Sequence, residues 1–156
     1  MKITAVVAAL TVLCALLLAA TPATAAPGLI DLSNVNFFDS VTINLKAEEK
    51  KITFVLFWAP WSQVSLAMNE DYKEVSRHFH KKKMSHVMIS RVNVGESALE
   101  IIAHKQKVRN FPTLKLYVAD EEPIAYKGDY AAEEMIEFLE KHLKRLGYSG
   151  KSDDEL

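Results

Sequence analysis

The spacing of apolar positions changes several times along this chain, and each spacing predicts one element. Residues 29–32 are a short apolar run that predicts a first strand. Residues 36–45 carry four apolar side chains at roughly helical spacing, which predicts a helix. Residues 52–58, ITFVLFW, form a continuous β-branched and aromatic run, which is typical of a central strand buried on both faces. Pro60 ends that strand, because proline cannot donate to a sheet ladder.

The middle of the chain predicts one long helix followed by a second central strand. Residues 62–79 show helical periodicity, with charged residues opposite the apolar face. The predicted inner face consists of Leu66, Met68, Tyr72, Val75 and Phe79. The lysines at 81–83 close this helix, since cations suit the negative end of a helix dipole. Residues 87–94 predict the next strand, and residues 99–108 a short helix and its exit.

The last third predicts a hairpin and a closing helix. Residues 113–118 alternate polar and apolar, which predicts a strand with one covered face. A turn at 120–123 leads into an edge strand at 124–126. An amphipathic helix follows at about 131–146, with Met135, Ile136, Leu139 and Leu143 inward, and Gly147 ends it. The order β-α-β-α-β-α-β-β-α predicts an α/β thioredoxin fold, in which helices flank a central mixed sheet.

The two ends of the chain predict its subcellular location. Residues 1–25 combine a basic start, an almost entirely apolar stretch and a small-x-small site, which predicts a cleaved secretory signal peptide. An uncleaved anchor is the alternative, because the apolar stretch is near the lower limit for a membrane span. Residues 151–156 form a tail whose last four residues resemble the K-D-E-L retrieval address. Those residues are Asp153, Asp154, Glu155 and Leu156, with Asp153 where a basic residue is usual. Together the ends predict a resident of the endoplasmic reticulum lumen that a retrieval receptor recognises.

Composition narrows the classes of function. Without the signal peptide about 131 residues remain, which suits one domain at residues 26–150. The remaining 18 basic residues (19 less Lys2) face 20 acidic ones, and this balance favours no nucleic-acid partner. No later stretch of the sequence has the length to span a membrane. Cys14 is the single cysteine, so the mature chain holds no thiol.

Two sequence blocks carry a family resemblance. Residues 57–65, F-W-A-P-W-S-Q-V-S, resemble the active-site stretch F-[YW]-A-P-W-C-x-x-C, with Ser62 and Ser65 in place of both cysteines. Residues 108–115, V-R-N-F-P-T-L-K, resemble the segment V-R-x-[FY]-P-T-[LI]-K. From about residue 29 to 146 the chain is similar to a single thioredoxin-like domain of the protein disulfide isomerase family. The resemblance implies that Pro112 is cis, lies against the former dithiol, and has a neighbour whose backbone pairs with bound peptide. A trans proline that begins an edge strand is the alternative.

Three departures from the family predict that redox catalysis is absent. A serine hydroxyl forms no S–S bond, so Ser62 and Ser65 are vestigial active-site positions and no catalytic residue is predicted. Leu56 stands where catalytic members keep a buried acidic residue, and Tyr130 where many have an arginine. No cofactor is expected. No metal site is expected either, since His78 and His80 point to different helix faces.

The surface around the former active site is then the candidate for function. Its residues are Trp61, Ser62, Val64, Phe111, Pro112 and Tyr130. They are expected to form a partly exposed apolar patch that binds unfolded or secretory client proteins, or other chaperones. A dedicated escort of one client is an alternative. Residual enzyme activity is another, with Ser62 as nucleophile, although Ser62 suits a helix N-cap and Val64 replaces the family's histidine.

Overall fold

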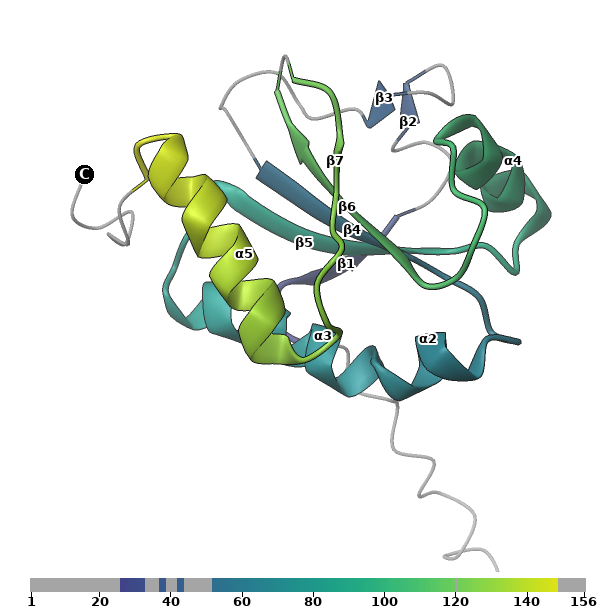
Figure 1. Cartoon of the computed structure of the whole chain (residues 1–156), viewed down its shortest axis with the longest axis horizontal. Helices are drawn as coiled ribbons and strands as arrows, with labels where there is room; N and C mark the ends of the chain where they lie inside the picture. Colours follow the sequence, from purple (N-terminus) through teal and green to yellow (C-terminus); the bar gives the residue numbers. More distant parts are fainter. Residues whose placement is uncertain (1–25, 33–36, 39–41, 44–51, 120, 149–156) are drawn as a thin grey trace, which may run out of the picture.

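The computed structural model describes residues 26–32, 37–38, 42–43, 52–119 and 121–148. Five strands form one mixed sheet in the order β1-β5-β4-β6-β7 (Figure 1). Their bounds are β1 Leu29–Asp31, β4 Ile52–Trp58, β5 Val87–Asn93, β6 Thr113–Val118 and β7 Ile124–Ala125. The helices are α2 Gln63–Ala67, α3 Asn69–Lys81, α4 Ser97–Lys105 and α5 Ala132–Arg145. The predicted signal peptide and the tail lie outside the described residues.

Strand β4 is the centre of the sheet. It pairs in parallel with β5 and antiparallel with β6, while β1 and β7 occupy the two edges. Its first six residues are buried, as the continuous apolar run predicts. Alternate side chains enter opposite layers: Phe54 and Leu56 pack with α3 and α5, whereas Val55 and Phe57 pack with α4. The predicted central mixed sheet flanked by helices is confirmed.

A buried tyrosine of α3 forms hydrogen bonds with the two central strands. The Tyr72 hydroxyl lies 2.8 Å from the carbonyl oxygen of Phe54 and 2.7 Å from that of Ser90. These carbonyls belong to β4 and β5, so one side chain of α3 bridges the two central strands. Complete burial raises the pKa of Tyr72 well above its ordinary value, and the hydroxyl therefore stays neutral and able to donate.

One predicted element is wrong. Residues 37–38 and 42–43 lie in two antiparallel strands, β2 (Phe37–Phe38) and β3 (Thr42–Ile43), and not in a helix. The aromatic pair and the β-branched pair both favour extended backbone, because their side chains lose freedom against a helical turn. Apolar spacing alone therefore misassigned this short segment.

The long helix predicted over residues 62–79 is divided. Met68 caps both the end of α2 and the start of α3, and its side chain is buried. Tyr72, Val75 and Phe79 face the core as predicted, but Leu66 is exposed. Leu66 lies in the separate helix α2, so the inner face predicted for one continuous helix does not extend to it. In α5, Met135, Leu139 and Leu143 are buried as predicted. Within the described part of the chain, no helix has the length and apolar character needed to cross a membrane.

Candidate functional site

The hydroxyl of Ser62 makes two hydrogen bonds at the start of α2. It accepts one from the backbone N–H of Ser65 at 3.2 Å, which makes Ser62 the N-cap of the helix. It donates the other to the carbonyl oxygen of Phe111 at 3.0 Å. The prediction that Ser62 suits a helix N-cap is confirmed. The second contact, between residues 49 positions apart, has no signal in the sequence.

Ser65, the second serine of this stretch, faces inward. Ser65 is buried, and its hydroxyl accepts a long hydrogen bond of 3.5 Å from the backbone N–H of Ala59. Leu56 is also buried, in the apolar layer beneath α3 and α5, where it pairs across the sheet with Leu114. An acidic side chain at that position would lie in an apolar environment, where a carboxylate is costly. The leucine removes that cost and with it a proton acceptor.

The loop before β6 completes the site. The Phe111–Pro112 peptide bond is cis, as the resemblance implied. The ring of Phe111 stands edge-on to that of Trp61, with 6.4 Å between ring centroids and an interplanar angle of 89°. The Tyr130 hydroxyl lies 3.5 Å from the carbonyl oxygen of Pro112, so the segment before α5 borders the same loop. Residues from three distant parts of the chain thus meet at the start of α2.

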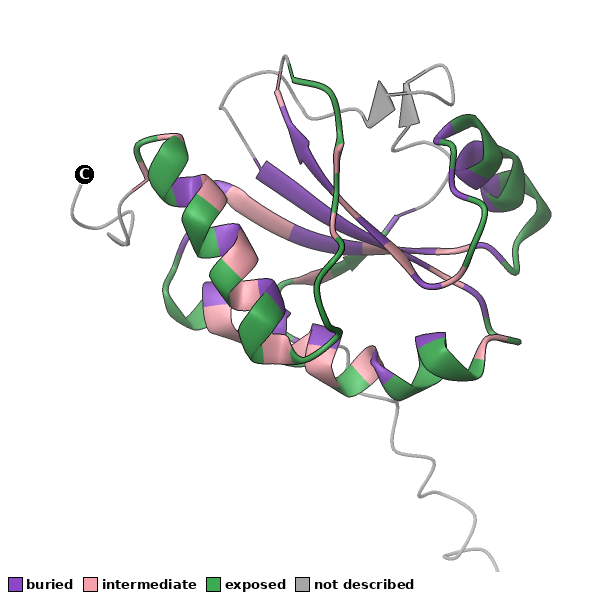
Figure 2. Ribbon diagram, viewed as in Figure 1, coloured by how far each residue is buried: buried purple, intermediate pink, exposed green. Residues whose placement is uncertain are grey.

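Much of this meeting point is open to solvent. Trp61 is 62% exposed, Val64 52% and Tyr130 37%, while Ser62 and Phe111 are half-buried. Exposed residues make up most of α2 (Figure 2). Pro112, the remaining apolar member of the predicted patch, is buried. We refer to Trp61, Val64, Phe111 and Tyr130 as the Trp61 surface.

The segment before Trp61 packs closely against the loop after β5, a contact that the sequence did not predict. Pro60 lies against Gly95, where an added Cβ would come within 2.9 Å of the proline ring. A glycine two residues after the end of β5 is therefore needed for the approach, since real Cβ atoms essentially never come so close. A glycine shortly after a strand is the sequence signal that could have indicated such a contact.

The chemistry of the site is neutral. Within the described residues, the hydrogen-bond partners of the Ser62 and Ser65 hydroxyls are backbone groups, and neither hydroxyl is hydrogen-bonded to a histidine or a carboxylate that could serve as a base. In the same residues, no cluster of histidine, cysteine, aspartate or glutamate has the arrangement of a metal site. What the site offers is apolar area, backbone groups and one capped helix start.

Comparison with known proteins places this geometry in a family. The thioredoxin family model matches residues 29–141, which is most of the chain. The chain belongs to the thioredoxin family. The match includes both sequence blocks at the Trp61 surface, the serine-substituted stretch and the cis-proline loop.

Relatives within this family are longer proteins. The chain is 31% identical over 96 residues to thioredoxin domain-containing protein 16 of Homo sapiens, covering 62% of this chain and 11% of that protein. It is 27% identical over 129 residues to a protein disulfide-isomerase of Medicago sativa, covering 81% of this chain and 23% of the relative. The chain therefore spans less than a quarter of either relative.

Among solved structures, the J-Trx1 fragment of ERdj5 has a similar fold. It superposes with a TM-score of 0.62 at 19% sequence identity, covering 76% of this chain and 51% of the fragment. The likeness confirms the predicted thioredoxin fold. The chain is thus a thioredoxin-fold relative of protein disulfide-isomerases, and its one cysteine, Cys14, lies far from the paired serines in sequence.

Proposed function

We propose that this protein is a non-catalytic, protein disulfide isomerase-like binding protein of the endoplasmic reticulum lumen. It holds unfolded or secretory client chains by reversible contact with the Trp61 surface. The observation that carries the proposal is that Trp61 is 62% exposed. Its ring also packs edge-on against that of Phe111. Tryptophan and other aromatic residues dominate binding energy at protein interfaces, and exposed apolar groups that gather at one place mark contact sites.

The loss of both thiols supports binding in place of redox exchange. Disulfide exchange needs a thiolate at the attacking position, and Ser62 has only a hydroxyl engaged with Phe111. An extended client segment would pair with the backbone of the loop that holds Phe111 and Pro112, while its apolar side chains contact Trp61 and Val64. Such contacts are reversible and tolerate many client sequences.

A holdase assay tests the proposal with a matched control. The aggregation of an unfolding client is followed with wild-type protein, Trp61→Ala, Phe111→Ala and Ile101→Ala. Ile101 is 60% exposed on α4, so it matches Trp61 in exposure but lies outside the Trp61 surface. We expect severalfold weaker suppression for Trp61→Ala and Phe111→Ala, and wild-type behaviour for Ile101→Ala. Equal suppression by all four proteins, or none by any, would remove the surface from the function.

The nature of the client and the location are tested in cells. Proximity labelling with wild-type protein and Trp61→Ala distinguishes a broad range of secretory clients from one dominant partner, which would favour a dedicated escort. Deletion of residues 153–156 is expected to increase secretion of the protein, because those residues resemble a retrieval address. Unchanged retention after the deletion would contradict that role for the tail.

A further inference from the structure

Consecutive carbonyl groups in the loop before β6 accept hydrogen bonds from side-chain hydroxyls. The acceptors are the carbonyl oxygens of Asn110, Phe111 and Pro112. Their hydroxyl donors, in the same order, are Thr113 at 2.6 Å, Ser62 at 3.0 Å and Tyr130 at 3.5 Å. The carbonyl groups that this loop could offer to a bound chain are therefore already engaged within the protein.

Two backbone donors of the same loop have no acceptor in the part of the chain that the structure describes. They are the N–H groups of Asn110 and Phe111. Asn110 is exposed and Phe111 is half-buried, so a bound chain can approach them. Pro112 has no N–H at all. Towards a bound backbone the loop is thus mainly a donor of hydrogen bonds.

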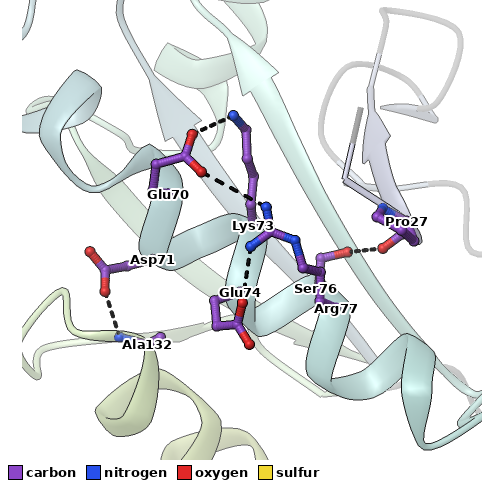
Figure 3. Close-up of polar contacts among 8 residues, drawn as sticks. All are labelled: Pro27, Glu70, Asp71, Lys73, Glu74, Ser76, Arg77 and Ala132. Carbon is purple, nitrogen blue, oxygen red and sulfur yellow. Dashed lines mark hydrogen bonds and ion pairs between the residues drawn. The ribbon is translucent and has the colours of Figure 1, made fainter. Parts of the chain in front are cut away.

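The segment that carries Tyr130 is held on both sides. Before it, the Tyr126 hydroxyl donates a hydrogen bond of 2.5 Å to the carbonyl oxygen of Asp129. After it, the N–H of Ala132 donates to the Asp71 carboxylate of α3 at 3.2 Å (Figure 3). The backbone around Tyr130 is therefore fixed next to the loop, while 37% of the residue stays exposed.

Aromatic side chains border the two open donors. Trp61 stands edge-on to Phe111, and Tyr130 approaches the next residue of the loop. Surfaces lined with aromatic residues bind proline-rich segments in the polyproline II conformation. Such a segment presents carbonyl acceptors but lacks an N–H at each proline. Its hydrogen-bonding groups therefore match those that the loop leaves open.

We propose that the Trp61 surface selects extended client segments that contain proline. This inference rests on the client-binding function proposed above and names the class of segment. Client carbonyls accept from the N–H groups of Asn110 and Phe111, and proline rings lie against Trp61 and Tyr130. A segment with ordinary N–H groups gains less. In a strand pair it would exchange two hydrogen bonds with Phe111, whose carbonyl is already engaged by Ser62.

Two capped heptapeptides test the selection by amide NMR titration of protein expressed from the full chain. One is Thr-Pro-Pro-Pro-Pro-Thr-Lys, and the other has valine in place of every proline. Valine is apolar and favours extended backbone, so apolar character alone does not favour the proline peptide. We expect wild-type protein to bind the proline peptide at least about threefold more tightly, since it is pre-organised and carries no N–H that must lose water without a partner. Trp61→Ala should weaken the binding of both peptides.

Substitution of Ser62 separates hydrogen bonding from shape. Ser62→Ala frees the Phe111 carbonyl, so the valine peptide should bind about three- to tenfold more tightly while the proline peptide is nearly unchanged. Ser62→Gly should give the same pair of results, and glycine retains most of the N-cap preference, so this variant keeps the fold. Ser65→Ala is the matched control. It removes a serine hydroxyl that is hydrogen-bonded to Ala59, and it should alter neither affinity.

Each other outcome contradicts a specific claim. Equal affinities of wild-type protein for the two peptides, or tighter binding of the valine peptide, would overturn the selection. So would no gain for the valine peptide in either Ser62 variant, or an equal gain for both peptides. In these cases weaker binding by Trp61→Ala would leave the client-binding function intact. Failure of both peptides to bind, while the holdase assay depends on Trp61, would likewise overturn the selection alone. Peptide binding that is unchanged in Trp61→Ala would contradict the client-binding function itself.

Discussion

The hydroxyl of Ser62 donates a hydrogen bond to the carbonyl oxygen of Phe111, 3.0 Å away. This bond joins the start of α2 to the cis-proline loop, at the first of the two serines that replace cysteines in the motif resemblance. The same oxygen also accepts a hydrogen bond from the N–H of Ser65 and so caps the helix. One small side chain therefore links the two segments that carry Trp61 and Phe111. The serine therefore has a structural role of its own in this scaffold.

Removal of the Ser62 hydroxyl should destabilise the fold. Ser62→Ala loses the N-cap and the contact with Phe111, which together contribute about 1 to 3 kcal/mol to the free energy of unfolding. Urea unfolding followed by tryptophan fluorescence measures the change. Gln63→Ala is the control, because Gln63 is the exposed neighbour in α2 and should alter stability by less than about 0.5 kcal/mol. Identical midpoints for Ser62→Ala and wild type would show that the bond contributes nothing.

Restoration of both thiols should restore redox chemistry. The double variant Ser62→Cys, Ser65→Cys places sulfur at a helix N-cap and at a buried position one turn later, a spacing that permits an intramolecular disulfide. We expect an intramolecular disulfide by mass spectrometry and measurable reduction of insulin. Each single variant and the wild type should remain at background, since exchange needs a second thiol to resolve the intermediate. A folded double variant that forms no disulfide would contradict the inherited geometry.

An acidic residue at position 56 should be tolerated only when it is protonated. Leu56 is 1% exposed, so Leu56→Asp places a carboxyl in the apolar layer and should cost at least about 3 kcal/mol near pH 7. Burial raises the pKa of that carboxyl above its unfolded value of about 3.9, so the loss of stability relative to wild type grows as pH rises. Thermal unfolding at about pH 4 and about pH 7 measures this. Leu56→Met should show a small loss that is independent of pH.

His142 should make the protein less stable in mild acid. Burial lowers the pKa of His142, and the positive charges of Arg145 and Lys141 lower it further, while Glu121 opposes them. Its Nδ1 is buried without a hydrogen-bond partner in the described structure. The unfolded chain therefore binds a proton first, and stability falls as pH drops from the unfolded pKa of about 6.5 towards the lower folded pKa.

The contribution of that histidine is separable by substitution. In His142→Gln, the decline in melting temperature between about pH 7.5 and about pH 5.5 should be smaller than in wild type. His104→Gln, at an exposed position on α4, serves as the control and should keep the wild-type decline. The same decline in all three proteins would exclude His142 as its source.

The sequence alone predicted the elements whose residues leave little choice. The run at 52–58 is β-branched and aromatic throughout, so its extended backbone and its burial on both faces followed directly, and the structure has β4 at those bounds. The period-2 alternation at 113–118 did the same for β6. Two local blocks also located the candidate site, because Ser62 and Pro112 stand within recognisable motifs. The helix predicted around Phe37 was wrong, since a few apolar residues fit a helical or an extended period equally.

The tertiary structure decided which of those residues face solvent and which touch. Trp61 is exposed and Pro112 is buried although both belong to the same predicted patch, because burial depends on what other elements pack above each residue. The bond from Ser62 to Phe111 spans 49 positions and exists only because the sheet brings the start of α2 beside the loop before β6. Local pattern predicts backbone conformation where the residue types favour one state, whereas contacts between distant segments arise only when the packed sheet and helices place them at one point in space.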